Sequence, residues 1–161
     1  MGHDTGTRRA MPTVDDIIAN FEILDDLDDR YRYLIELGRD LTPLPPEAHA
    51  EANRVRGCAS QVWLETKVAG GQGDDPLLHF RGDSDAHLVK GLIALALALY
   101  DGRPASEIAT TDATPLFGRL GLGGHLTRQR SNGFAAMVDR IRADARRALA
   151  GDPPEAPAAL H

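Results

Sequence analysis

The chain has 161 residues, of which 42% are hydrophobic and 26% are charged, a composition that fits one globular domain with its own core. A formal net charge of −6 argues against a nucleic-acid-binding protein, because such binding needs a cationic surface that displaces counterions from phosphates. The single cysteine excludes an internal disulfide and is typical of a protein from a reducing compartment.

The sequence carries no targeting or membrane signal that we can identify. Its N-terminus lacks the basic segment and the following apolar run of a secretory signal peptide. The longest apolar run, residues 88–100, is interrupted by Lys90 and is shorter than the ~20 residues that a membrane-spanning helix requires. We therefore expect a cytoplasmic protein without a membrane segment.

The two ends of the chain differ in composition from its middle. Residues 1–12 are polar and have no periodic apolar face, and residues 151–161 are rich in proline and alanine. Such segments cannot bury enough apolar surface to fold. The sequence therefore predicts a disordered lead and a disordered tail around one domain, residues 13–150.

Two short helices are predicted at the start of the domain. The first begins at Thr13, a suitable N-cap, and carries apolar residues at helical spacing through Phe21 and Leu24. The second follows the acidic run 25–29, whose charges complement a helix N-terminus and are expected to be solvated and not to bind a metal. Prolines between residues 41 and 46 then predict an extended connection.

A β-hairpin is predicted in the middle of the chain. Apolar and polar residues alternate from Val62 to Val68, which indicates a half-buried strand. Residues 70–76 have turn chemistry, and residues 77–81 can return as a second strand. Residues 53–56 are predicted to add a third strand.

The second half of the domain is predicted to be mainly helical. A helix over residues 85–100, capped by Ser84 or Asp83, is apolar nearly all round and should be enclosed by other elements. A short helix over residues 104–109, a turn at 114–115 and a glycine-containing loop over 118–124 follow. The loop follows no strand, so we do not expect a dinucleotide site there.

The last predicted helix begins after Thr127 and has one apolar stripe, expected to be core. The stripe comprises Phe134, Met137 or Val138, Ile141, Ala145 and Leu149. With the hairpin and the preceding helices, it predicts an α+β fold in which a small antiparallel sheet of about three strands packs against several helices.

Cys58 is the strongest candidate for a reactive residue in the chain. Gly57 precedes it and small residues follow it, so its thiol should be uncrowded on a bend next to the strand that holds the only tryptophan, Trp63. A lone cysteine is often a small buried hydrophobe, but Cys58 lies outside any periodic apolar pattern. The residues leave two interpretations open, a reactive thiol and a packed one.

A reactive thiol needs neighbours that favour its thiolate. The cationic candidates are Arg54, Arg56, Arg128 and Arg130. A cysteine hydrolase would also need a histidine base, for which the candidates are His79, His87 and His125. One cysteine is too few for zinc or iron–sulfur ligation, so we expect no bound metal.

Three separated motifs, in order and in register, resemble the SufE family of sulfur-acceptor proteins over residues 14–149. The motifs are Gly57-Cys58-Ala59-Ser60-Gln61-Val62-Trp63-Leu64, Gly82-Asp83-Ser84-Asp85-Ala86 with Val89-Lys90-Gly91-Leu92, and His125-Leu126-Thr127 with Arg130 and Asn132-Gly133. The resemblance implies a fold like that of the NifU-type cluster-scaffold proteins. One departure is Ala59, where many family members have glutamine.

The resemblance also implies a function. Cys58 would accept sulfur as a persulfide from a cysteine desulfurase of the SufS or CsdA type, stimulate that enzyme, and deliver the sulfur to an iron–sulfur scaffold of the SufBCD type. Pyridoxal phosphate (PLP) would belong to the desulfurase, and this chain would be a sulfur carrier and not an enzyme itself. Asp85 and Arg130 would hold the Cys58 loop or contact the desulfurase.

Two other classes of function remain alternatives. One is a cysteine-dependent hydrolase, and the other is a non-catalytic interaction domain whose cysteine is structural. Only the carrier predicts that Cys58 gains the mass of one sulfur atom from a desulfurase. The sequence leaves a homodimer open.

Overall fold

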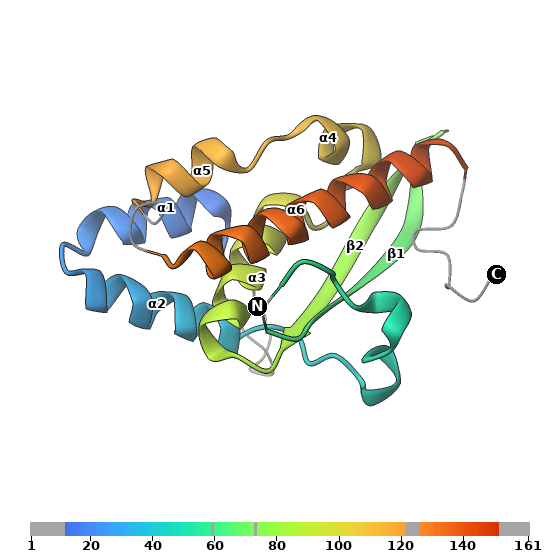
Figure 1. The fold of residues 1–161 in the computed structure, drawn as a ribbon. Helices are drawn as coiled ribbons and strands as arrows, with labels where there is room; N and C mark the ends of the chain where they lie inside the picture. The colour runs from blue at the N-terminus through green and yellow to red at the C-terminus, as the bar shows by residue number, and fades with distance from the viewer. Residues whose placement is uncertain (1–11, 59, 73, 122–125, 152–161) are drawn as a thin grey trace, which may run out of the picture.

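The computed structural model describes residues 12–58, 60–72, 74–121 and 126–151 (Figure 1). Within these ranges, a three-stranded antiparallel sheet packs with six α-helices, which confirms the predicted α+β class. Apart from Pro12 and Gly151, the predicted disordered ends 1–12 and 151–161 lie outside the described residues.

The first two helices begin where the sequence predicts. In α1 (Val14–Ile23), the Thr13 Oγ1 accepts a hydrogen bond from the Asp16 backbone at 3.1 Å, and the Asp16 carboxylate accepts one from the Thr13 backbone. In α2 (Leu27–Arg39), Asp26 is the N-cap and accepts from the Asp28 backbone at 3.1 Å. Part of the acidic run therefore satisfies the free N–H groups of a helix start.

The predicted hairpin is present, but its strands are longer than expected. β1 (Val62–Gln72) pairs antiparallel with β2 (Asp75–Ser84), in a register that places Val62 opposite Ser84. Pairing continues through most of the predicted turn, residues 70–76, with a register shift between Ala69 and Gly71. A β-bulge accommodates one extra residue in a strand, so the backbone pairing continues beyond it. The predicted turn was therefore too long.

The predicted third strand is wrong. β3 is Arg103–Pro104, which pairs with β2, so the sheet order is β1-β2-β3. Residues Glu51–Asn53 instead form a 3-10 turn, and Arg54 makes only an isolated bridge to Trp63. The carbonyls of Ala52 and Arg54 accept hydrogen bonds from the Arg140 side chain, a long-range interaction that sequence periodicity does not register.

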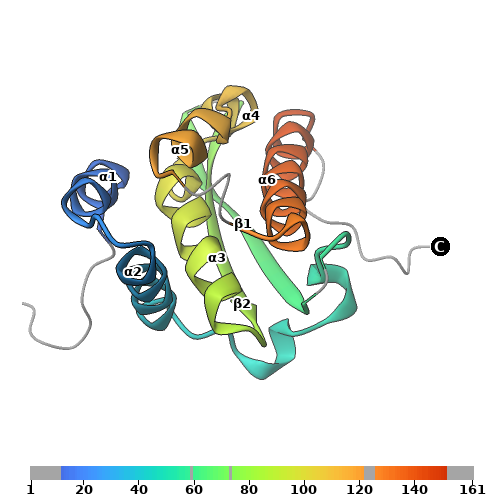
Figure 2. The same ribbon diagram turned by 60° about the vertical axis from the view of Figure 1, so that its left-hand side comes forward.

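The central helix α3 (His87–Tyr100) is almost entirely buried and lies between α2 and α6 (Figure 2). Its predicted start at residue 85 and its predicted side-chain cap are wrong, because the N-cap position is Ala86. Asp83 and Ser84 instead accept hydrogen bonds from the backbone N–H groups of Ser84 and Ala86, within the turn before the helix.

Three helices complete the chain: α4 (Ala105–Thr110), α5 (Thr114–Arg119) and α6 (Arg128–Leu149). Thr127 caps α6 as predicted, by accepting from the Arg130 backbone at 3.2 Å. The predicted apolar stripe of α6 is buried except for Leu149 at its end. Gly118 of the predicted loop belongs to α5, and residues 122–125 lie outside the described residues.

α6 runs along the hairpin and contacts α3, so its N-terminal turns come close to the Cys58 segment (Figures 1 and 2). None of the helices in the described ranges combines the length and the apolar character needed to cross a membrane.

Candidate functional site

Cys58 lies on the loop that leads into β1. We define the Cys58 loop as residues 55–62, of which residue 59 is outside the described residues. The Val55 N–H donates to the Val62 carbonyl at 2.8 Å and closes the loop at its base. Gly57 has φ +89°, a conformation that favours glycine, so the bend predicted from the residues around Cys58 is confirmed.

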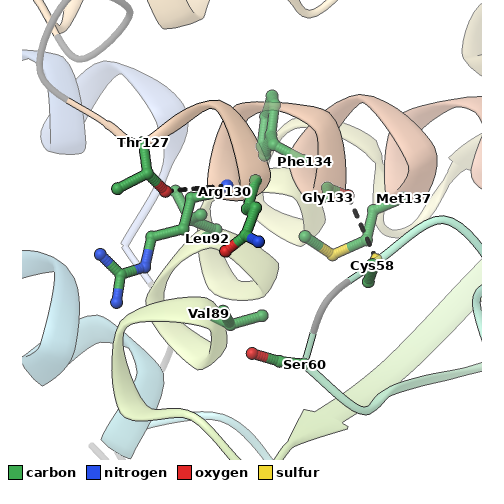
Figure 3. Close-up of a pocket in the computed structure, with 10 residues that line it drawn as sticks. Cys58, Ser60, Val89, Leu92, Thr127, Arg130, Gly133, Phe134 and Met137 are labelled. Atoms are coloured by element: carbon green, nitrogen blue, oxygen red, sulfur yellow. Dashed lines mark hydrogen bonds between the residues drawn. The ribbon is translucent and has the colours of Figure 1, made fainter.

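The sulfur of Cys58 packs against the start of α6. Its thiol donates a hydrogen bond to the Gly133 carbonyl at 3.6 Å (Figure 3). A Cβ atom at position 133 would lie only 3.5 Å from the sulfur, so a side chain longer than that of alanine would occupy its place. The sulfur can therefore rest here because residue 133 has no side chain larger than a methyl group.

A pocket of about 160 Å³ opens beside the sulfur. It lies between the Cys58 loop, α3 and the N-terminal turns of α6 (Figure 3). Its lining residues are Cys58, Ser60, Val89, Leu92, Thr127, Gln129, Arg130, Gly133, Phe134 and Met137. Phe134 and Met137, expected as core, are buried and also form part of this wall. We call this hollow the Cys58 pocket.

The charge state of the thiol is controlled by two opposing effects. Burial raises the pKa of Cys58 above its ordinary value, and the positive charge of Arg54 lowers this pKa by a smaller amount. Of the other cationic candidates, Arg130 lines the pocket, whereas Arg56 is exposed and pairs with Glu51 at 3.2 Å. Packing against α6 thus favours the protonated form of the thiol near neutral pH.

Asp85 lies beside the segment that follows Cys58. Its Oδ1 accepts from the Gln61 backbone N–H at 3.2 Å, and its own N–H donates to the Gln61 carbonyl at 3.4 Å. These contacts join the Cys58 loop to the turn before α3. Of the two residues predicted from the resemblance, Arg130 therefore lines the pocket, whereas Asp85 contacts the Cys58 loop at Gln61, and their roles remain predictions.

Neither of the two described histidine candidates lines the pocket. His79 is on β2, 3.7 Å from the Asp101 carboxylate, and His87 is the exposed first residue of α3. His125, like Ala59, lies outside the described residues. Among the described residues, those that line the pocket include no histidine and no carboxylate, and no three His, Cys, Asp or Glu side chains gather to hold a metal.

Sequence reasoning missed a polar cluster behind the site, formed by Thr66 of β1 with Arg140 and Asp144 of α6. Asp144 is fully buried and accepts from the Thr66 hydroxyl at 2.7 Å and from the Arg140 Nε at 3.3 Å. One signal was available: Asp144 stands between Ile141 and Ala145 on the apolar side of the helix, where a carboxylate needs a partner.

Comparisons with known proteins identify the family. The family model "SufE: Fe-S metabolism associated domain" matches residues 15–145. An uncharacterized SufE-like protein of Rhizobium etli is 52% identical over 141 residues, which cover 88% of this chain and 95% of the relative. Another of Rhizobium meliloti is 50% identical over 135 residues, with coverages of 84% and 96%.

The fold has a counterpart among solved structures. The solution structure of a hypothetical protein from Thermus thermophilus matches with a TM-score of 0.68 at 23% identity, and the match covers 88% of this chain and 99% of that one. At this identity the likeness supports the fold alone, whereas the family rests on the sequence matches. The chain belongs to the SufE family, whose domain is associated with Fe–S metabolism.

Proposed function

We propose that this protein accepts sulfur on Cys58 from a PLP-dependent cysteine desulfurase and delivers it for iron–sulfur cluster assembly. The observation that carries the proposal is the placement of the only cysteine on a glycine-bent loop, beside a pocket with space next to its sulfur. Membership of a family associated with Fe–S metabolism supports the same interpretation.

The transfer step is a thiol exchange that needs no external oxidant or reductant. The Cys58 thiolate attacks the terminal sulfur of the desulfurase persulfide, and a new sulfur–sulfur bond forms. The old sulfur–sulfur bond breaks, and the desulfurase cysteine leaves as a thiolate and takes up a proton. Cys58 then carries the sulfur as a persulfide, which a second thiol exchange passes to the scaffold.

The resting position of Cys58 suits a carrier that is inactive on its own. A thiolate cannot donate a hydrogen bond, so deprotonation removes the contact with the Gly133 carbonyl and brings negative charge next to an acceptor oxygen. Reaction therefore requires Cys58 to leave α6 and meet its partner. Contact with the desulfurase would draw the loop outward and expose the thiolate.

The Cys58 pocket can hold the cargo between transfers. Its volume of about 160 Å³ exceeds the ~30 Å³ share of one water molecule, so one further sulfur atom fits beside the thiol. Val89, Leu92 and Met137 form the apolar part of its wall. A single cysteine carries sulfur but does not hold a cluster, and a reducing cytoplasm suits a thiol that is exposed only when its partner binds.

Mass spectrometry tests the proposal directly. The protein is mixed with a PLP-dependent cysteine desulfurase and L-cysteine, without reductant, and the peptide containing Cys58 is measured. We expect a gain of one sulfur, about 32 Da, on Cys58 and none in Cys58→Ser. A wild-type protein that gains no sulfur, or a Cys58→Ser variant that still accelerates the desulfurase as well as the wild type, would refute the acceptor role.

We also propose that Asp85 and Arg130 support sulfur uptake by Cys58. We expect Asp85→Ala to slow sulfur uptake because the Gln61 N–H loses its partner, and Arg130→Ala to slow it because a cation at the pocket is removed. Sulfur uptake is compared with the free energy of unfolding of each variant. Full activity of both variants at unchanged stability would show that neither residue takes part.

A further inference from the structure

Arg140 is the cation of the polar cluster behind the site, and its three nitrogens have three different partners. Nε faces the buried Asp144 carboxylate at 3.3 Å. Nη2 donates to the Ala52 carbonyl at 3.1 Å and Nη1 to the Arg54 carbonyl at 3.4 Å. A planar guanidinium suits such a divergent set of acceptors, whereas a lysine ammonium is a single point charge.

The two carbonyls belong to the segment that runs directly into the Cys58 loop. Arg54 is followed by Val55, which is buried and whose N–H closes the base of the loop on Val62. The segment is not part of a strand, so the sheet does not hold it as it holds β1. Its carbonyls are held by α6 instead.

Asp144, the anionic partner of Arg140 in the cluster, lies in the core. Asp144 is fully buried, and its Oδ2 also accepts from the Thr66 hydroxyl of β1 at 2.7 Å. The side chain of Arg140 is only 14% exposed. A partly buried guanidinium with a buried counter-charge is fixed more firmly than an exposed arginine.

From this geometry, we propose that Arg140 is a positioning residue that holds the base of the Cys58 loop, and so keeps the Cys58 sulfur against Gly133 until a partner draws it out. The effect on the free thiol stands by itself, whereas the effect on a persulfide rests on the proposed function. Arg140 does not line the Cys58 pocket, so it acts through the backbone of residues 52–54.

The predicted consequence of loosening this contact follows from the environment of the thiol. Burial is the larger influence on the pKa of Cys58 and raises it, while Arg54 lowers it. A loop released from α6 loses both effects, so the pKa falls toward the ordinary cysteine value. More thiolate is then present near neutral pH, and alkylation speeds up.

Arg140→Lys tests the proposal without leaving Asp144 unpaired. Lysine keeps a positive charge for the buried carboxylate but cannot reproduce the fork that spans both carbonyls. The matched control is Arg142→Lys, on the same helix, because Arg142 also donates through two nitrogens to a backbone carbonyl, that of Ala109, at 3.2 Å. Ala109 belongs to α4 and not to the Cys58 segment.

The first measurement is the rate of Cys58 alkylation by iodoacetamide over a range of pH, on folded protein. We expect Arg140→Lys to raise the rate near neutral pH by about three- to tenfold and to lower the pH midpoint, and Arg142→Lys to match the wild type. A rate in Arg140→Lys equal to that of the wild type, or an equal rise in both variants, overturns the proposal.

The second measurement is the lifetime of the Cys58 persulfide in the presence of glutathione, after loading by a desulfurase. We expect the persulfide of Arg140→Lys to lose its outer sulfur to glutathione faster than that of Arg142→Lys, and equal lifetimes would count against the proposal. If the wild type takes up no sulfur, the proposed function fails, while the alkylation rates still decide the role of Arg140.

Discussion

Two hollows that share Phe134 in their walls differ in size and in chemistry. The Cys58 pocket has a volume of about 160 Å³, and a second cavity between α5 and α6, which we call the α5–α6 cavity, has about 350 Å³. Phe134 lines both, and it stacks on Phe117 on the side of the larger one, with ring centroids 4.6 Å apart.

The smaller hollow is the better candidate for a site because a nucleophile lies in its wall. The α5–α6 cavity is lined by three charged residues, two hydroxyl residues and five apolar residues, but it has no thiol. Volume alone would select the α5–α6 cavity instead. A thiol that the fold holds beside a pocket is the more informative criterion.

Truncating Phe134, which lines both hollows, should have the largest effect on stability and on Cys58 alkylation. Phe134→Ala deletes a buried aromatic ring, and we expect the free energy of unfolding to fall by about 3–5 kcal/mol. Alkylation of Cys58 should also accelerate, because its pocket would open into the α5–α6 cavity. Chemical denaturation and alkylation rates check both effects.

Phe117→Ala is the matched control, since it removes the same ring stacking from the other side. Phe117 is partly exposed and does not line the Cys58 pocket, so a smaller loss of stability and an unchanged alkylation rate are expected. Equal effects of the two variants would mean that Phe134 does not shield the thiol.

Adding a side chain at Gly133, which lines the Cys58 pocket, should have the next largest effect on Cys58 alkylation. Gly133→Val places methyl groups where the Cys58 sulfur now lies, because even a Cβ atom there would be 3.5 Å from it. The sulfur should be displaced, and alkylation near neutral pH should rise by about tenfold as the thiol becomes solvated. Sulfur uptake should still occur, but the persulfide should be short-lived in glutathione.

Gly133→Ala sharpens this prediction, because its Cβ atom makes only ordinary contact with the sulfur. Alanine also has a higher helix propensity than glycine, by up to about 1 kcal/mol, so the variant should be as stable as the wild type or more stable. An alkylation rate as high as that of the valine variant would disprove the packing argument.

The pH dependence of stability should show a smaller effect of the same environment. Because burial raises the pKa of the folded Cys58 thiol, the folded state keeps its proton when the unfolded chain has lost it. The resulting stabilisation is complete below the ordinary cysteine pKa and is lost as the pH rises through the folded value. Urea unfolding at about pH 7 and about pH 10 should therefore show a larger loss for the wild type than for Cys58→Ser.

Filling the α5–α6 cavity should have the smallest effect. Ala135→Leu adds apolar volume at the exposed edge of that cavity, away from Cys58. We expect changes within about 0.5 kcal/mol in stability and no change in alkylation or sulfur uptake. Loss of sulfur uptake in this variant would place the α5–α6 cavity in the functional site and would reverse the comparison.

Local patterns predicted much of the secondary structure. Thr13 and Thr127 were identified as N-caps because a hydroxyl before an apolar-periodic segment satisfies helix N–H groups within a few residues. The alternation of apolar and polar residues after Val62 correctly indicated a strand, because successive side chains of an extended backbone point to opposite faces. Errors arose where distant residues decide the outcome, as with residues 53–56 and β3.

The sequence by itself determined that Cys58 is the only thiol, that it sits on a bend, and that its motifs resemble those of the SufE family. Only the tertiary structure decided what packs against it and against its loop, because Gly133 and Arg140 belong to α6, far from Cys58 in the sequence. Burial and hydrogen bonding of a thiol depend on atoms that packing brings together. The local periodicity of a sequence does not predict which distant residues will pack against one another. The position of the thiol on a bend was therefore predictable from the sequence, and its packing against α6 was not.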